Sequence, residues 1–463
     1  MTAVYEINTW PWLAGLGVRG LADVPAEVWD RLIGFDAVWL MGVWERSPAG
    51  VAVARGDAGL QRDFRAALPD LSGQDLVGSP YCVRRYQVDE RLGGAGGLAA
   101  ARAELRKRNL KLILDYVPNH VAPDHPAVTE HPGWFINGTA EDLAADPGGW
   151  FAAGDRVIAR GRDPYFPPWP DVAQLNAFDP GLREATAATL LDIAGQCDGL
   201  RCDMAMLVFN DIFGGTWGDR AGPRPEAEFW PGIIAALRAE HPGFLLIAEA
   251  YWDTEWELQR QGFDLCYDKR LYDRLAHEDA ASVRDHLRAG LDYQNRLLRF
   301  VENHDEPRAA TALPGPRGKA AAVAIATLPG STLWHDGQFE GRRVKLPVFL
   351  GRYPDEPVDE DLRDFYDRLV VLKDAGRWHL LDTPDVLAWT WEGRDSRHLI
   401  VINFAAAEIW TRVRLPWSSA GERWRLTDLL DGRVFDRDGD ELARDGLVVG
   451  LPAWGFHVLE VRS

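Results

Sequence analysis

The sequence predicts an α/β protein built on a (β/α)8 TIM barrel, with a small inserted domain after strand 3 and a C-terminal antiparallel β domain. Apolar strand-like runs alternate with helix-like stretches over most of the 463 residues, as expected of a parallel sheet or barrel. A long connection rich in Pro, Gly, Asp and Trp interrupts this alternation, and the helical pattern stops near residue 376. These three observations define the predicted architecture.

Eight apolar runs are the candidate barrel strands, and the stretches between them have apolar residues near helical spacing. Eight strands with helices between them are typical of a (β/α)8 barrel. The candidate strands are residues 3–10, 35–44, 110–117, 198–206, 244–252, 263–271, 297–303 and 331–337. The helical patterns include residues 25–35, 97–109, 181–197, 229–241 and 319–330.

Two segments depart from the barrel pattern. Residues 121–176 are too many for a structureless loop inside a barrel, so they predict an inserted subdomain. After residue 376, short alternating runs are separated by Gly, Asp and Pro turns, which predicts a β-sandwich domain over residues 377–463. The catalytic barrel is therefore expected to span residues 1–376.

Composition restricts the partners of the protein. The chain has 51 Lys and Arg against 70 Asp and Glu, a formal charge of −19, which repels phosphate backbones and anionic membranes. We therefore expect neutral small molecules as partners, with no nucleic acid and no membrane. The first residues lack the pattern of a signal peptide and no apolar run is long enough to span a bilayer, so we expect a cytoplasmic protein. The four cysteines are interpreted as packing residues.

Acidic residues lie at the carboxyl ends of four candidate strands: Asp115, Asp203, Glu249 and Asp305. That end of a (β/α)8 barrel is where active sites are built, so the four side chains are predicted to converge. Arg201 lies two positions before Asp203, and alternate residues of a strand share one face. A buried ion pair contributes little net stability, which favours a functional role. The alternative, that each acid caps a helix or pairs with a surface base, is weaker for four acids in succession.

The segments around these acids resemble, in order, the four motifs of glycoside hydrolase family 13, the α-amylase family. They are DYVPNH at 115–120, GLRCD at 199–203, IAEAYW at 247–252 and ENHDEPR at 302–308. The resemblance implies that Asp203 is the nucleophile, that Glu249 is the general acid/base and that Asp305 holds the distorted sugar. A retaining glycosidase uses two such carboxyls about 5 Å apart.

The resemblance also implies a set of substrate-binding residues. His120 and His304 would hydrogen-bond the sugar hydroxyls in the subsite that is cleaved, and Tyr81 would stack on the same sugar. Trp252 would form the neighbouring acceptor subsite. Outside these motifs, a lone His or an aromatic residue is more often part of the core.

The shared strand face of Arg201 and Asp203 is interpreted as charge tuning. An opposite charge within a few ångströms lowers the pKa of a carboxylate, so Arg201 would keep Asp203 ionised and oriented. By resemblance, Asp115 on the preceding strand would balance Arg201, which two acids would then share.

The chain departs from the family pattern after the nucleophile. Many relatives have Lys-His a few positions on, whereas this chain has MAMLVF at 204–209. The apolar Met204 and Met206 speak against a typical endo-acting starch amylase. Asn119 matches a calcium ligand of the family, but calcium prefers six or more oxygens and no companions can be placed. We therefore predict no metal and no cofactor.

The leading hypothesis is a retaining α-glycoside hydrolase that acts on α-glucosides or short maltooligosaccharides by double displacement through a covalent glycosyl-enzyme. The alternative is an α-glucan transglycosylase with the same triad, which would differ in how it excludes water and holds the acceptor. A remote alternative is a non-catalytic carbohydrate-binding protein on the same fold. The expected partner is an α-linked oligosaccharide substrate.

Overall fold

Eight strands form a closed barrel, in which each strand is hydrogen-bonded to the two strands beside it. Their pairings are parallel, for example between the first two strands and between the fourth and fifth. Each strand lies inside one of the eight predicted runs, which confirms the TIM barrel. The strands are β1 (Ala3–Asn8), β2 (Ala37–Met41), β5 (Lys111–Tyr116), β11 (Gly199–Cys202), β12 (Leu245–Ala248), β13 (Leu265–Tyr267), β14 (Leu297–Arg299) and β15 (Ser331–His335).

The computed structural model describes residues 2–372, 376–394, 396–417 and 421–462. The chain divides into two compact units. The N-terminal unit contains residues 2–267 and 345–355, with barrel strands β1 to β13. The C-terminal unit contains residues 268–344 and 356–463, with β14 and β15. The boundaries expected from the sequence, at residues 121, 176 and 376, stay predictions. Within the described ranges, no helix is both long and apolar enough to cross a membrane.

The strands and helices of the N-terminal unit follow from local sequence. All five residues of β2 are buried, as expected of a parallel strand covered on both faces. Helix α8 begins with Pro180, and the Asp179 side chain accepts a hydrogen bond from the N–H of Leu182, which satisfies a free donor of the first turn. The helices are α1 (Thr9–Leu16), α2 (Ala26–Asp30), α3 (Pro48–Gly56), α4 (Ala58–Ala67), α5 (Gly94–Lys107), α8 (Pro180–Ala194), α9 (Asn210–Trp217), α10 (Phe229–Glu240) and α11 (Glu255–Gln261). Short 3-10 turns are η1 (Leu21–Asp23), η2 (Glu90–Leu92), η4 (Ala205–Val208) and η5 (Gly218–Ala221), and β3 (Trp44–Arg46) pairs with β4 (Val83–Val88).

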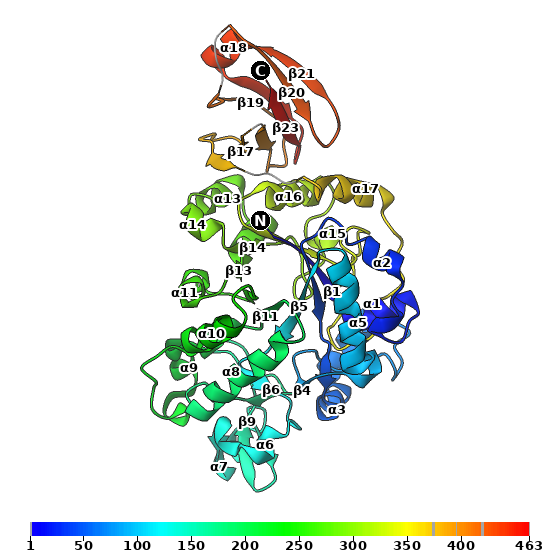
Figure 1. Ribbon diagram of the computed structural model, residues 1–463, viewed down its shortest axis with the longest axis vertical. Coiled ribbons are helices and arrows are strands. Elements are labelled where there is room, and N and C mark those ends of the chain that lie inside the picture. Colours follow the sequence, from blue (N-terminus) through cyan, green and yellow to red (C-terminus); the bar gives the residue numbers. More distant parts are fainter. Residues whose placement is uncertain (1, 373–375, 395, 418–420, 463) are drawn as a thin grey trace. The chain divides into compact units, whose positions relative to one another are not determined.

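The connection between β5 and α8 has secondary structure and an apolar core of its own. Its elements lie together in Figure 1, and Phe135, Ile158 and Leu175 are among the buried side chains of its core. Antiparallel strands form the sheet β7-β9-β8 and the pair β10-β6. The elements are β6 (His120–Val121), α6 (Ala127–Glu130), η3 (Pro132–Trp134), β7 (Asn137–Gly138), α7 (Ala140–Ala145), β8 (Trp150–Ala153), β9 (Arg156–Ala159) and β10 (Ala173–Gln174).

The C-terminal unit combines helices with antiparallel sheets. The order β16-β17-β18-β23-β20-β21 makes a six-stranded sheet, and β19 pairs with β22. Side chains of both sheets, such as Val413, Val449 and Leu459, share one apolar core, which confirms the C-terminal β domain. The strands are β16 (Arg377–Leu380), β17 (Leu387–Glu392), β18 (Arg397–Ile402), β19 (Ile409–Val413), β20 (Arg423–Asp428), β21 (Val434–Asp438), β22 (Leu447–Leu451) and β23 (Phe456–Arg462). The helices are α12 (Lys269–His277), α13 (Ala280–His286), α14 (Leu291–Gln294), α15 (Ala309–Ala312), α16 (Pro316–Thr327), α17 (Glu360–Leu369) and α18 (Gly439–Asp445).

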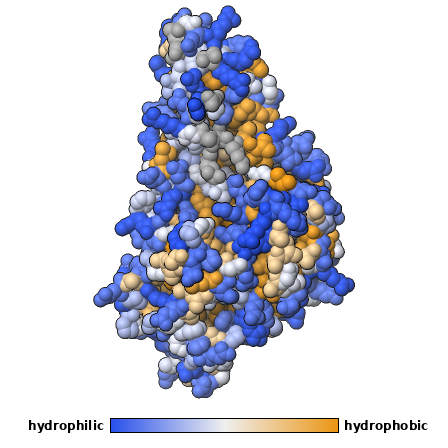
Figure 2. All heavy atoms as spheres, in the orientation of Figure 1, coloured by the Kyte–Doolittle hydropathy of each residue, from blue (hydrophilic) through white to orange (hydrophobic). Residues whose placement is uncertain are grey.

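Hydrophilic residues cover most of the face in Figure 2, with smaller apolar areas between them. Large apolar side chains that are well exposed include Tyr165, Phe166 and Trp410. Single exposed apolar residues are normal, whereas neighbouring ones can mark a binding site.

Candidate active site

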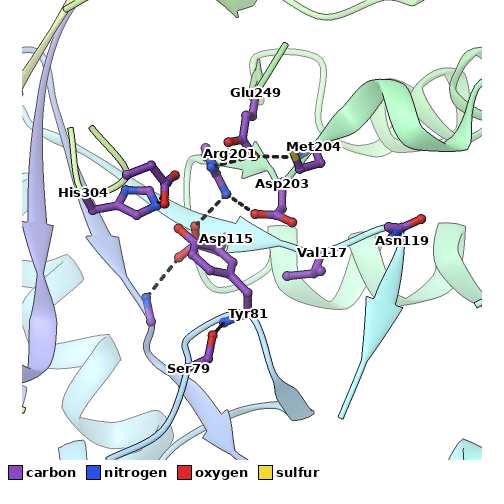
Figure 3. Close-up of polar contacts among 12 residues, drawn as sticks. Ser79, Tyr81, Asp115, Val117, Asn119, Arg201, Asp203, Met204, Glu249 and His304 are labelled. Carbon is purple, nitrogen blue, oxygen red and sulfur yellow. Dashed lines mark hydrogen bonds and ion pairs between the residues drawn. The ribbon is translucent and has the colours of Figure 1, made fainter. Parts of the chain in front are cut away.

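Four charged side chains at the carboxyl ends of three neighbouring strands form a buried ion network (Figure 3). Arg201, at the end of β11, lies at its centre. Its Nη1 is 2.7 Å from Oδ1 of Asp203 and 4.0 Å from Oδ1 of Asp115, and its Nη2 is 2.8 Å from Oε2 of Glu249. The predicted pairing of Arg201 with Asp203 is present. Of the other two acids, Glu249 lies closer to Arg201 than Asp115 does, and the sequence did not suggest this contact.

Backbone hydrogen bonds continue beyond the strand ends and hold Asp203 and Glu249 in place. In the parallel register, Arg201 lies opposite Asp115 of β5. The N–H of Asp203 donates to the carbonyl of Tyr116 at 2.8 Å, and the N–H of Glu249 donates to the carbonyl of Cys202 at 3.0 Å. The last positions before each loop are therefore held by the barrel, as a precise site requires.

Aromatic rings surround the Arg201 guanidinium. Its central carbon lies 5.3 Å from the Trp39 ring centre, 5.1 Å from that of Tyr81 and 5.6 Å from that of Tyr267. Burial acts to lower the pKa of Arg201, but Glu249, the two tyrosines and Asp203 outweigh it and hold the pKa well above its usual value. Arg201 is thus a permanent cation. Trp39 and Tyr267 lie on β2 and β13, and neither was singled out from the sequence because barrel-interior aromatics look like core residues.

Several groups of the N-terminal unit contact the Glu249 carboxylate. Besides Arg201, the N–H of Met204 donates to Oε2 at 2.6 Å and the Tyr251 hydroxyl donates to Oε1 at 2.9 Å. Met204 adopts φ 39° and ψ 51°, a left-handed conformation that is uncommon outside glycine and marks local strain. Sequence reasoning treated Met204 only as an apolar departure and missed its backbone. Tyr251 was also missed, and its position two residues after the acid was the signal that could have identified it.

Asp115 is anchored by hydrogen bonds from Gly42 and Trp44, and Gly42 itself lies where a larger residue would not fit. The N–H of Gly42 donates to Oδ2 of Asp115 at 3.0 Å, and the Trp44 indole donates to the Asp115 carbonyl at 2.7 Å. Gly42 has φ +78°, and a Cβ there would lie 2.6 Å from Arg46 and 2.8 Å from Pro80. The position of Asp115 therefore depends on a glycine 73 residues earlier in the chain.

Tyr81 and His120 lie near the network on different segments. The Tyr81 N–H donates to the Ser79 hydroxyl at 3.1 Å, and the Tyr81 ring covers Arg201. His120 begins β6, and its ring centre is 5.1 Å from that of Trp169. Burial lowers the pKa of His120 to about 3, although a backbone hydrogen bond with Tyr81 acts to raise it. His120 is therefore neutral at physiological pH and can hydrogen-bond without carrying charge.

Trp252 lies in the turn after Glu249 with 37% of its surface exposed. The rings of Trp252 and Tyr165 pack edge to face, with their centres 4.8 Å apart. Tyr165 and Phe166 belong to a loop of the insert, and the backbone N–H groups of both residues donate to Oδ1 of the buried Asp163. This cluster offers aromatic faces to solvent next to a residue that the sequence assigned to an acceptor subsite.

His304 and Asp305 belong to the C-terminal unit and follow β14. His304 Nε2 is 2.8 Å from Oδ2 of Asp305, and Oδ1 of Asn303 accepts the N–H of Asp305 at 2.9 Å. The loop is closed by a buried ion pair of 2.6 Å between Arg308 and Glu302. The structure thus brings Tyr81, Asp115, Arg201, Asp203 and Glu249 together in one unit, and His304 and Asp305 together in the other.

Potential metal ligands do not cluster in the described residues: no group of three or more His, Cys, Asp or Glu side chains could hold an ion there. Oδ1 of Asn119, the one residue matched to a calcium ligand, accepts a hydrogen bond from Gln174 Nε2 at 2.9 Å. The prediction of no calcium remains a prediction. All four cysteines lie in the described ranges, where they are buried and form no disulfide.

Comparisons with known proteins find similar α-glucan enzymes, although no family model matches the chain. The α-amylase MalA of Haloarcula japonica is 25% identical over 351 residues, which are 72% of this chain and 47% of MalA. An α-1,4-glucan:maltose-1-phosphate maltosyltransferase of Burkholderia pseudomallei is 24% identical over 322 residues, which are 67% of this chain and 24% of that protein. The chain thus spans about half the length of the first relative and about a quarter of the second.

Solved structures show the same fold over the whole chain. The maltogenic α-amylase AmyB of Thermotoga neapolitana superposes with a TM-score of 0.69 at 19% identity, over 99% of this chain and 98% of AmyB. The cyclic α-maltosyl-(1→6)-maltose hydrolase of Arthrobacter globiformis gives a TM-score of 0.65 at 16% identity, over 99% and 98%. At these identities the structures establish the fold of the chain.

Proposed function

We propose that this chain, which belongs to the α-amylase family of glycoside hydrolases, family 13, is a retaining enzyme that acts on α-linked glucosides or short maltooligosaccharides. The observation that carries the proposal is the Arg201 network, in which one guanidinium contacts both Asp203 and Glu249. Double displacement needs two carboxyl groups with different tasks, held in fixed geometry at the mouth of the barrel.

The proposed reaction has two steps. In the first, Asp203 forms a bond to the anomeric carbon while the bond from that carbon to the leaving oxygen breaks, and Glu249 gives its proton to that oxygen. In the second, water or a sugar hydroxyl gives a proton to Glu249 and attacks the anomeric carbon, which releases Asp203. Two inversions at one carbon retain the α configuration.

The other residues have roles that their surroundings support. Arg201 cannot lose its proton, so it keeps Asp203 negative for attack. His120 is neutral and can hydrogen-bond a sugar hydroxyl without attracting a counter-ion. Asp305, with His304 beside it, is proposed to hold the hydroxyls of the sugar that is attacked.

Transfer to a sugar acceptor is the second candidate function. It is favoured by the similarity to a maltosyltransferase and by the exposed aromatic pair of Trp252 and Tyr165, which could hold an acceptor by stacking. Incubation with maltotriose and chromatography over time separates the two functions. Shorter sugars alone indicate hydrolysis, whereas longer products indicate transfer, and no turnover of any α-glucoside would exclude both.

The matched pair Asp203→Asn and Asp198→Asn tests whether the network is catalytic. Both acids flank β11, but Asp198 precedes the strand and pairs with Arg102 at 2.6 Å. Loss of the nucleophile should lower turnover of maltotriose about a thousandfold or more, with sugar binding retained, whereas Asp198→Asn should stay near the wild type. Sugar binding that is unchanged in Asp203→Asn, with no turnover by either protein, would instead support a binding protein. NMR of the first anomer released tests retention.

A further inference from the structure

The two carboxylate oxygens of Glu249 have chemically different partners. Oε2 forms an ion pair with Nη2 of Arg201 at 2.8 Å and accepts the N–H of Met204 at 2.6 Å (Figure 3). Oε1 receives the hydroxyl of Tyr251 at 2.9 Å. Guanidinium and backbone N–H groups can only donate, whereas a tyrosine hydroxyl can donate or accept.

This difference determines where Glu249 can carry a proton. A proton on Oε2 would meet the N–H of Met204 and the positive charge of Arg201, and neither group has a lone pair to receive it. A proton on Oε1 lies beside a hydroxyl that can rotate from donor to acceptor. The oxygen next to Tyr251 is therefore the one that can take up and release a proton with its surroundings satisfied in both states.

The backbone holds Tyr251 in this place. Thr254 donates to the Tyr251 carbonyl through its hydroxyl at 2.6 Å and through its N–H at 3.3 Å. The intervening Trp252 and Asp253 both have φ +60°. Left-handed conformations are unfavourable for L-residues, and such strain is concentrated at functional sites. The turn is thus fixed at an energetic cost immediately after the proposed acid.

We infer that Tyr251 is a positioning residue that orients Oε1 of Glu249 toward the leaving oxygen. The inference rests on the proposed function. Tyr251 forms and breaks no covalent bond: Glu249 still gives its proton to the leaving oxygen in the first step and regains one from the incoming hydroxyl in the second. Before the sugar binds, the Tyr251 hydroxyl can accept from the protonated acid; when that proton is directed to the leaving oxygen, the hydroxyl turns to donate to Oε1 and then to the carboxylate that remains.

The test compares Tyr251→Phe on two substrates that differ in their need for an acid. Maltotriose has a poor leaving group that must be protonated, whereas fluoride leaves α-maltosyl fluoride with little assistance. We expect kcat/KM to fall about 30-fold for maltotriose and less than about threefold for the fluoride, because positioned acid catalysis contributes about 10²–10⁴-fold. Tyr116→Phe is the control, since the Tyr116 hydroxyl bonds Thr186 at 3.2 Å.

The outcomes are distinct. A change in the substrate ratio for Tyr251→Phe, with none for Tyr116→Phe and with an unfolding temperature near that of the wild type, supports the inference. An equal loss on both substrates, or no loss on either, overturns it, since a merely structural residue does not select among leaving groups. If the wild type turns over neither substrate, the proposed function fails instead.

Discussion

Arg201 contacts Asp203 and Glu249 through different nitrogens of one planar group. A lysine has a single charged nitrogen and cannot reproduce this fork of donors. The strand spacing of Arg201 and Asp203 was visible in the sequence because alternate residues share a face. The contact with Glu249 was not visible, because it depends on the register between β11 and β12.

Arg201→Lys tests the fork directly. We expect kcat/KM for maltotriose to fall about 100-fold or more and the pH profile to change, because at least one carboxylate loses its partner. Arg102→Lys is the matched control, because Arg102 binds Asp198 before the same strand. An unchanged pH profile in Arg201→Lys would contradict the proposed charge tuning.

Trp252→Ala tests the acceptor assignment. Removal of an exposed stacking ring should raise KM for maltotriose about tenfold with a smaller effect on kcat, since stacking on one ring contributes roughly 1–1.5 kcal/mol. Trp410→Ala removes a ring that is 72% exposed on β19 of the C-terminal unit and should leave KM unchanged. Equal KM values for Trp252→Ala and wild type would remove Trp252 from the binding site.

At the scale of elements, all eight barrel strands were predictable because buried parallel strands read as continuous apolar runs. The helices corresponding to the five predicted patterns, α2, α5, α8, α10 and α16, begin and end within a few residues of them, except that α2 ends earlier, at Asp30. Backbone devices were not predictable. The left-handed Met204 and the turn at Trp252 and Asp253 have no sequence signature, because residues other than glycine rarely adopt these angles.

Gly42→Ala tests the loop between β2 and β3 that anchors Asp115. An added Cβ would collide with Arg46 and Pro80 at a positive φ, so unfolding should become easier by about 2–4 kcal/mol, with activity lowered. Gly17→Ala is the control, because Gly17 has φ +70° and nothing within 4 Å of the added atom. It isolates backbone strain, of about 1 kcal/mol. Similar denaturation midpoints for both variants would show that the collision is relieved.

At the scale of the whole molecule, one buried network links helices and a barrel strand of the C-terminal unit. Asp268, before α12, lies 2.9 Å from Nε2 of His286 on α13 and 3.1 Å from Nε of Arg299 on β14. Burial acts to raise the pKa of Asp268, but His286 and Arg299 outweigh it and lower the pKa to about 2 from 3.8. Sequence reasoning missed this group because nothing local marks it.

Asp268 should make the free energy of unfolding depend on pH in the acid range. Its folded pKa is depressed, so the stabilisation is fully present above about pH 4 and is lost as the pH falls toward about 2. The shift corresponds to roughly 2 kcal/mol. Asp268→Asn should flatten this part of the curve and destabilise the protein by about 3–5 kcal/mol, since Arg299 stays buried without its counter-charge. Urea unfolding at several pH values measures both, with exposed Asp70→Asn as control.

The shared guanidinium also makes Asp203 and Glu249 thermodynamically interdependent. Proton uptake by either carboxylate removes its negative charge and so removes its repulsion of the other carboxylate beside Arg201. The two acids then titrate as one system, whose apparent constants belong to the pair and to neither residue alone. A substitution at one acid is therefore expected to move the limb of the rate profile that belongs to the other acid, and pH profiles of the unsubstituted protein should be fitted with an interaction term.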